Sequence, residues 1–415
     1  MLFWLGITIR LIFLVYNKPE KMMPICIIYF FVTVINDIFL MSVLELANAF
    51  GVSYQLGDMM MLLFVSPVII DLFKQHLVKK NINNALLTFF TTLLLFNMIQ
   101  GLSDFGLTSE WFGDVRTLLR FWGAMIWGKC FFNVAYAKKY MRMLDIVMTI
   151  IVIITFVLWG LDLGLGFHPL PSQYYATLSD GGSTMRFIQS YEVFGITLYA
   201  LYLARKSISY KGLLDIKAIV YLGIVVLFQH RSIWMAMALG IIVIIWSEFT
   251  TNKCRAKLLM QIIAVVVGSA AFMMFSQGDL ASNISKSWEV FMKLITGKKV
   301  ENSTATTRTQ VWNATLEDLN GISLIAGRPF GYGYAKSIGW QTSPHSGYVR
   351  FLARTGYCGF ISFLLIGIGA LIRTIKKFQY IPEFVACVIG FMYGYDGTWL
   401  CGLIIGIALS IYTKP

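Results

Sequence analysis

Three groups of residues in this sequence contain side chains that can bind a phosphate or transfer a proton. The first is Gln229-His230-Arg231, which lies between two apolar runs. The second is Arg308 with Trp312, four residues apart and therefore on one face of a helix. The third is Pro344-His345-Ser346, directly before another apolar run. Fixed guanidinium groups can bind a phosphate through paired hydrogen bonds, and a histidine can accept a proton near neutral pH.

Each group also has a plainer interpretation. An arginine at a bilayer edge, such as Arg231, can extend toward lipid headgroups, and a single histidine such as His345 is more often structural. Arg350 and Arg354, one turn apart, would line the same face of a helix. Three further polar residues are expected on the same side of the membrane, although the last of them fits a polar turn equally well: Arg116, Arg120 and Asp396.

The elements that position these residues must be membrane-spanning helices. Of 415 residues, 57% are hydrophobic and 13% are charged, whereas soluble proteins have about 25% charged residues. Apolar runs near the length of a bilayer crossing recur throughout, and backbone hydrogen bonding in lipid makes them helices. The sequence predicts an all-α polytopic integral membrane protein with about 12 or 13 spans. They are 2–16 (short), 24–45, 56–73, 85–101, 119–136, 144–162, 187–204, 214–229, 232–249, 257–276, 348–372, 381–393 and 398–412.

Charge placement predicts the orientation of these spans. The net charge of +13 would by itself suggest nucleic-acid binding, but the basic residues lie in short clusters between the apolar runs. One set of loops holds 19 basic residues, whereas the short loops of the opposite set hold only Arg116, Arg186 and Arg231. The positive-inside rule places the first set and the C-terminus in the cytoplasm. No nucleic-acid partner is expected.

One loop on the predicted outer side is much longer than the others. Residues 277–345 form a polar segment of about 70 residues, and the regions expected are 1–276, 277–347 and 348–415. Within this loop the run from Arg308 to Leu319 has helical spacing. The Gly-rich stretch Gly327–Gly333 then predicts a turn. We expect this loop, outside the membrane, to carry the function.

The sequence offers no pattern for binding a metal or cofactor. None of the six cysteines belongs to a Cys-x-x-Cys motif or a Cys/His cluster, so small buried hydrophobic residues are the expected role. The long loop contains no DxD motif and no carboxylates spaced for a divalent ion. No metal and no cofactor are predicted.

The motifs occur in an order that resembles the O-antigen ligase and polymerase superfamily, which includes WaaL-type ligases and Wzy-type polymerases. The resemblance covers about residues 225 to 365, and the topology is similar along the whole chain. It rests on four stretches: Gln229–Trp234, Arg308–Trp312, Pro329–Gly333 and Pro344–Gly359.

This resemblance implies a GT-C-like membrane glycosyltransferase in the bacterial cytoplasmic (inner) membrane, with its active site on the periplasmic or extracellular side. It would take a glycan from an undecaprenyl-pyrophosphate donor and transfer it, with inversion, to a glycan or lipid-linked acceptor in polysaccharide or lipopolysaccharide synthesis. Arg231 and Arg308 match the family's arginines and His345 its histidine, which implies cations for the leaving group and a general base. Expected partners are membrane lipids, a chain-length regulator and a flippase. Expected substrate-binding residues are Arg116, Arg120, Arg350, Arg354, Asp396, Trp312 and Tyr348.

Three activities agree with these features to different degrees. A polymerase would join lipid-linked repeat units of O-antigen, capsule or exopolysaccharide, and this is the favoured hypothesis. A ligase would pass the finished glycan to lipid A–core, and the motifs do not separate the two because the donor is shared. A flippase for lipid-linked sugars would instead favour short loops and inverted repeats.

The predicted orientation can be tested at position 303 of the long loop. A single cysteine replacing Ser303 in a cysteine-free background should react with a membrane-impermeant thiol reagent in intact or outer-permeabilised cells. A cysteine replacing Lys138, in a predicted cytoplasmic cluster, serves as the control and should react only after lysis. Labelling of position 303 only after lysis would reverse the topology.

Overall fold

A computed structural model gives the structure of the chain. It describes residues 2–39, 45–49, 52–73, 82–165, 187–211, 213–228, 230–251, 261, 289, 304–339, 344, 346–377, 381–392 and 398–410. These residues divide between two compact units, each of which is described by itself. Unit 1 comprises Met1–Tyr29, Ser42–Tyr140 and Glu301–Pro415, and unit 2 comprises Phe30–Met41 and Met141–Val300. The three regions expected from the sequence are a different division and stay a prediction.

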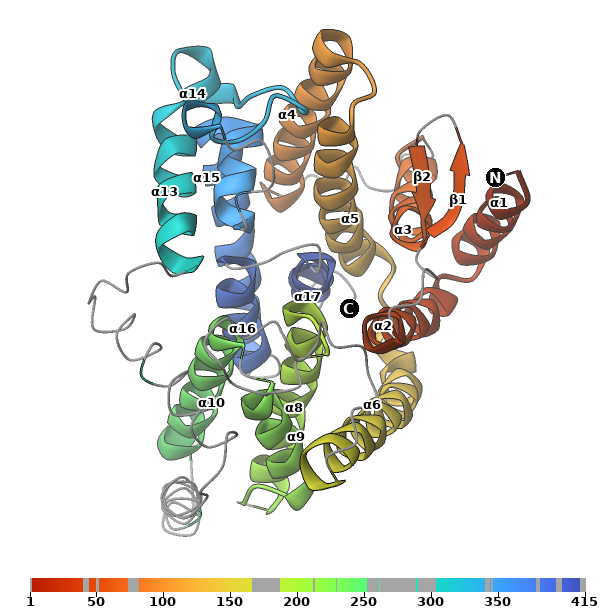
Figure 1. Ribbon diagram of the computed structural model, residues 1–415, viewed down its shortest axis with the longest axis vertical. Helices are drawn as coiled ribbons and strands as arrows, with labels where there is room; N and C mark the ends of the chain where they lie inside the picture. The colour runs from red at the N-terminus through yellow and green to blue at the C-terminus, as the bar shows by residue number, and fades with distance from the viewer. Residues whose placement is uncertain are drawn as a thin grey trace. The chain divides into compact units, whose positions relative to one another are not determined.

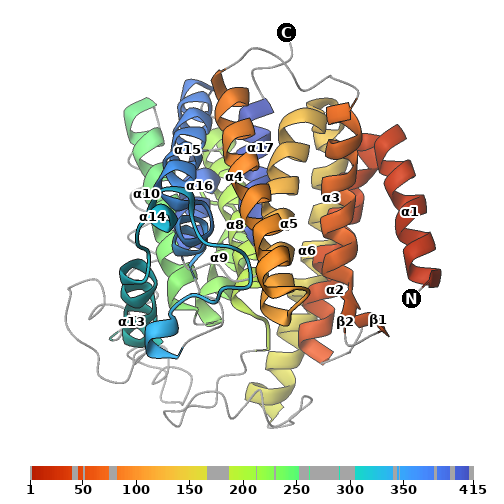
Figure 2. The same ribbon diagram turned by 90° about the horizontal axis from the view of Figure 1, so that it is seen from above.

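Unit 1 holds most of the described helices and residues 304–339 of the long loop. Figures 1 and 2 show these elements as a ribbon. A small antiparallel hairpin pairs β1 (Glu45–Ala49) with β2 (Val52–Gln55). Two helices, α2 (Met22–Phe39) and α6 (Ala137–Trp159), begin in unit 1 and continue into unit 2. The others are α1 (Leu2–Asn17), α3 (Leu56–Phe73), α4 (Ile82–Phe105), α5 (Ser109–Phe131), α13 (Thr304–Glu317), α14 (Ile322–Ala326), α15 (Gly347–Lys377), α16 (Ile381–Met392) and α17 (Thr398–Ser410).

Unit 2 packs α8 (Ser190–Lys211) against α9 (Ile216–Leu227) and α10 (Arg231–Thr251). Three buried aromatic side chains, Trp159, Phe187 and Phe228, contact one another with ring centroids 4.9–6.1 Å apart. Such aromatic contacts add to the stabilisation from burial alone. They fix the junction between α9 and α10, where the motif with Arg231 lies.

The described helices are those of a multi-pass membrane protein. Four of them are long and apolar enough to cross a membrane: Pro19–Phe39, Ala85–Phe105, Val134–Asp162 and Gly347–Ile375. Five shorter apolar helices accompany them, namely Leu2–Asn17, Leu56–Ile70, Ile216–Leu227, Ser232–Ser247 and Trp399–Ser410. The all-α polytopic fold class is therefore confirmed, and the total of 12 or 13 spans stays a prediction.

Helix α5 is the central helix of unit 1, because α3, α4 and α17 all pack against it. On α17 two glycines four residues apart, Gly402 and Gly406, face the α5 backbone. A Cβ atom there would lie 2.4 Å from the Phe121 carbonyl oxygen and 2.1 Å from that of Met125. This small-xxx-small spacing lets the two backbones approach closely, as is common between helices in membranes. Any larger residue at either position would force α17 away.

Helix α15 is interrupted at Gly356. Its φ of 61° and ψ of −174° are not helical and belong to a region that only glycine populates readily. The α14 backbone lies against it, since a Cβ atom on Gly356 would be 2.2 Å from the Ile325 carbonyl oxygen. Gly359 meets α4 instead, where a Cβ atom would be 3.2 Å from the Leu93 side chain. Both glycines therefore leave room for a neighbouring helix.

Several predicted spans have bounds that differ from those of the observed helices, for example 144–162 against Ala137–Trp159 and 187–204 against Ser190–Lys211. The span 24–45 was too long, because α2 ends at Phe39 and the polar residues of the following hairpin form a β-strand from Glu45. The span 119–136 began too late, because α5 starts at Ser109. Charged residues in its first turns lowered the apolar signal although the backbone is helical there. The predicted span 257–276 lies outside the described residues except for Gln261.

A pair of glycine substitutions in α15 tests the interruption. Gly356→Ala should destabilise the protein by about 1–3 kcal/mol from the backbone conformation alone, and by more because its Cβ atom would meet α14. Gly367→Ala is the matched control, since no atom lies within 4 Å of the added Cβ atom, and it should be neutral or slightly stabilising. Thermal unfolding midpoints of the two purified variants are compared with that of the wild type. Equal midpoints for the two variants would contradict a requirement for glycine at position 356.

Candidate functional site

Helix α13 connects two of the motifs predicted to act together. It contains both Arg308 and Trp312, and its apolar face is buried as the helical spacing predicted. The indole Nε1 of Trp312 donates a hydrogen bond to the Pro344 carbonyl oxygen at 2.6 Å. Pro344 directly precedes His345, which lies outside the described residues. The contact therefore joins the helix with Arg308 to the start of the Pro-His-Ser motif.

The serine of that motif begins α15. Ser346 is buried, its carbonyl oxygen accepts from the Arg350 amide at 3.0 Å, and its hydroxyl lies 3.4 Å from the Val349 amide. This is the N-cap position, where a serine satisfies helix N–H groups that have no partner within the helix. Arg350 is buried in the first turn, and the Tyr348 hydroxyl donates to the Val388 carbonyl oxygen of α16 at 3.0 Å. The motif thus fixes the start of α15, the helix that carries Arg350 and Arg354.

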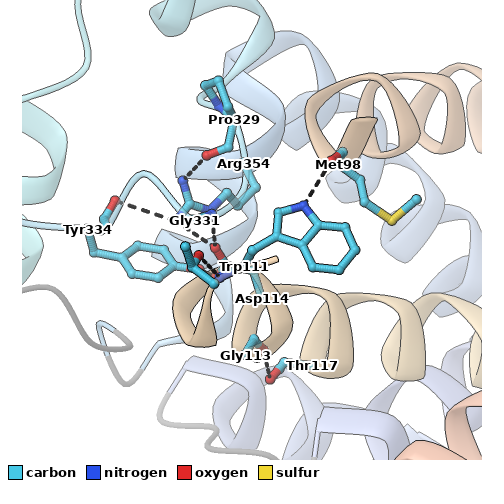
Figure 3. A network of polar contacts seen from close by, with 11 residues as sticks. Met98, Trp111, Gly113, Asp114, Thr117, Pro329, Gly331, Tyr334 and Arg354 are labelled. Carbon is cyan, nitrogen blue, oxygen red and sulfur yellow. Dashed lines mark hydrogen bonds and ion pairs between the residues drawn. The ribbon is translucent and has the colours of Figure 1, made fainter. Parts of the chain in front are cut away.

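Arg354, predicted to bind substrate, is fully buried and bonded to protein groups (Figure 3). Its Nη2 lies 2.7 Å from Oδ2 of Asp114 on α5, a residue that is 4% exposed. Its Nη1 donates to the Pro329 carbonyl oxygen at 2.7 Å, and Nη2 lies 3.4 Å from that of Gly333. Both carbonyls belong to the predicted Gly-rich turn. Arg354 therefore fastens this turn to two helices.

Asp114 completes the same network, and the sequence analysis missed it. Its Oδ2 accepts from the Gly331 amide at 3.1 Å, and its Oδ1 accepts from the Tyr334 hydroxyl. The Tyr334 ring also faces the Arg354 guanidinium, whose carbon lies 4.4 Å from the ring centroid. Burial of Tyr334 and the nearby Asp114 charge raise the pKa of its phenol, so it stays a proton donor. The only sequence signal was an acidic residue among apolar neighbours.

Helices α4 and α15 hold the turn from its other sides. The Phe330 ring is fully buried, and its amide donates to the Asn97 carbonyl oxygen at 3.1 Å. Gly101 of α4 lies so close to Phe330 that a Cβ atom would be 2.2 Å from its carbonyl oxygen. The Arg328 amide donates to the Ala353 carbonyl oxygen at 2.8 Å. This carbonyl is free for the loop because the helix is interrupted three residues later, at Gly356.

Two cationic side chains contact an aromatic ring of this turn. The Lys336 ammonium lies 3.8 Å from the Tyr332 ring centroid, and the Arg328 guanidinium carbon lies 4.8 Å from it. Arg328 is itself buried, 3.8 Å from Asp318. Burial lowers the pKa of Arg328, while the Asp318 charge raises it. Cation–π contacts of this kind keep the basic groups on the turn without neutralising them.

The other predicted site residues fall into distinct environments. Arg116 forms an ion pair with Asp58, whereas Arg120, one turn further along α5, is buried beside Gly57. In unit 2, His230 is buried, its Nε2 is 2.9 Å from the Ile188 carbonyl oxygen, and Arg231 begins α10. Asp396 lies outside the described residues. Among the described residues, no three His, Cys, Asp or Glu side chains cluster to hold a metal ion.

Comparison with known proteins gives one family match. The fold defines a multi-pass membrane protein, and within unit 1 the motif with Trp312 contacts the motif that begins at Pro344. Residues 217–364 match the family model described as O-Antigen ligase, a segment that includes α9, α10, α13, α14 and part of α15. This match supports membership of the O-antigen ligase and polymerase superfamily and confirms the resemblance drawn from the motifs. No curated protein and no solved structure matches the chain.

A double-mutant cycle measures the network around the turn. Removing one partner of a buried ion pair costs about 3–5 kcal/mol, so Asp114→Asn and Arg354→Met should each strongly destabilise the protein. The double variant should cost clearly less than the sum of the two, because neither charge is left unpaired. Glu110→Gln, an exposed carboxylate on the same helix, should change stability by no more than about 0.5 kcal/mol. Additive effects of the two network substitutions would exclude the coupling.

Proposed function

We propose that this protein polymerises undecaprenyl-pyrophosphate-linked oligosaccharide repeat units on the outer face of the bacterial cytoplasmic membrane. The family match gives the coarser function, a membrane protein of the O-antigen ligase and polymerase type with a glycosyltransferase-like role. The observation that carries the proposal is the hydrogen bond from Trp312 to Pro344, because it brings the helix with Arg308 to the motif with the histidine. The proposed transfer requires both motifs, because one supplies a cation and the other supplies a base.

The proposed reaction is an inverting glycosyl transfer. The acceptor oxygen forms a bond to the anomeric carbon while the bond from that carbon to the pyrophosphate oxygen breaks. The bonding electrons leave with the lipid pyrophosphate, and the acceptor hydroxyl proton passes to His345. The growing negative charge requires cations that are already in place, and Arg231 and Arg308 supply them. The proposal needs no metal.

The remaining site residues fill different roles in this proposal. Arg350, buried in the first turn of α15, is proposed to add positive charge beside the donor. Arg354 is proposed as a positioning residue, because its guanidinium contacts Asp114 and the Gly-rich turn. Trp312 likewise positions Pro344 through its indole nitrogen.

A ligase is the second candidate, and one observation favours it. The matching family model carries the description O-Antigen ligase. A ligase would transfer the finished glycan to lipid A–core with the same donor chemistry. Supplying purified protein with lipid-linked repeat units separates the two, since a polymerase lengthens the lipid-linked glycan and a ligase labels added lipid A–core. A flippase would move the labelled lipid across a vesicle membrane without making either product.

Substitution of the two arginines by lysine tests their role in the transfer. Lysine keeps the charge and loses the planar pair of donors, so Arg308→Lys and Arg231→Lys should each lose most of the polymer formed. The protein should still insert at normal levels. Arg373→Lys is the control, because Arg373 donates to the Leu409 carbonyl oxygen at the other end of α15 and should keep full activity. Full activity in either test variant would make that arginine an interfacial anchor.

Substitution of His345 separates proton transfer from positioning. His345→Ala should leave donor binding nearly intact and reduce turnover of purified lipid-linked substrate by roughly two to four orders of magnitude. His345→Gln retains hydrogen bonding without basicity and should be similarly slow. The measurements are single-turnover rates and donor affinity for each variant. A Gln variant with the wild-type rate would assign the base to another residue.

A further inference from the structure

Arg120 is a buried arginine for which the described part of the chain supplies no polar partner. It lies on α5, one turn after Arg116, and 8% of the residue is exposed. Its buried Nε has no acceptor, and no ion pair or aromatic ring of the described residues reaches its guanidinium group. Taking a charge out of water without a partner costs folding free energy. A bound anion would neutralise this buried charge.

Arg116, one turn before Arg120 on α5, has a carboxylate partner. The Nε atom of Arg116 lies 2.7 Å from Oδ1 of Asp58. The other oxygen of this carboxylate accepts from the Gln55 amide at 2.8 Å, which closes the start of α3. Asp58 is thus used by Arg116 and by the Gln55 amide that directly precedes α3. Of the two arginines on this face of α5, only Arg116 is neutralised by a described carboxylate.

Gly57 at the start of α3 provides the space that the Arg120 guanidinium occupies. A Cβ atom on Gly57 would lie 2.5 Å from Nη2 and 2.9 Å from Cζ of Arg120. The guanidinium therefore lies directly on the backbone of the first turn of α3, an 18-residue helix. The N-terminus of a helix carries partial positive charge and free N–H groups, which also favour an anion. The Arg120 guanidinium and the partial positive charge of the α3 N-terminus therefore lie together at Gly57.

A simple extension toward lipid headgroups does not explain this arrangement. An arginine that extends in this way exposes its charged end at the surface of the helix bundle. Arg120 is instead enclosed between α5 and α3, at the level of the α3 N-terminus. The predicted topology places that terminus at the outer boundary of the membrane, where the phosphates of lipids lie.

We propose that Arg120 and the first turn of α3 bind a phosphate group carried by a lipid of the outer leaflet. The planar guanidinium favours phosphate because it can donate two parallel hydrogen bonds. The group can come from a polyprenyl pyrophosphate or from a phospholipid, since both present the same phosphate oxygens at this depth. The inference does not rest on the proposed glycosyl transfer, because it concerns binding alone.

Binding to the purified full-length protein in a neutral detergent tests this site. The probes are farnesyl pyrophosphate and dioctanoyl phosphatidic acid, with farnesol and dioctanoylglycerol as matched lipids without phosphate. Wild-type protein should bind at least one phosphate lipid and neither control. Arg120→Met should weaken that binding about tenfold or more, and Arg120→Lys should recover part of it. Arg142→Met, a control at an exposed arginine of α6, should keep the wild-type affinity.

The lipid-free proteins give a second, independent measurement. Arg120→Met removes an uncompensated buried charge, so its unfolding midpoint should equal or exceed that of the wild type. Arg116→Met leaves Asp58 without its ion pair and should lower the midpoint. Binding of farnesyl pyrophosphate alone would identify the polyprenyl source, and equal binding of both probes would identify a general phospholipid site. Unchanged affinity in Arg120→Met, or a lower midpoint for it, would overturn the proposal.

Discussion

One buried charge pair, between Asp114 of α5 and Arg354 of α15, fixes the described part of the long loop. Both side chains are almost completely removed from solvent, so each charge requires the other and a full set of hydrogen bonds. The Gly-rich turn supplies those bonds through its carbonyls, one amide and the Tyr334 hydroxyl. The polar groups of the turn and the buried pair therefore satisfy one another, and the loop becomes part of the helix bundle.

The interruption of α15 holds the loop as well, because it frees a helix carbonyl that the loop can bond. A continuous helix would use its own carbonyls and leave none for the loop. The break at Gly356 leaves the Ala353 carbonyl free for Arg328 and lets α14 lie against the helix. Arg350 lies before the break, on the part of α15 that Ser346 caps. The first part of α15 thus positions the loop and also carries Arg350, which is proposed to add positive charge beside the glycan donor.

The sequence was sufficient for the parts of the fold that depend on hydropathy. Helix α3 has the predicted bounds, and the α13 face with Val311 is buried as its spacing required. It was insufficient where a charged residue has a structural partner far along the chain. Asp114 and Arg354 are 240 positions apart, so neither position alone distinguishes an internal ion pair from a substrate contact. The polar first turns of α5 were missed for the same reason, because hydropathy does not detect buried polar pairs.

Hydrogen exchange across the Gly-rich turn tests most directly whether the loop is fixed to the bundle. The amides of Arg328, Phe330 and Gly331 each donate to a group on a different helix. In purified, ligand-free protein, a peptide covering residues 327–333 should exchange as slowly as the buried part of α15. Exchange at the rate of an unstructured chain, while α15 remains protected, would show that the turn is not held by Asp114 and Arg354.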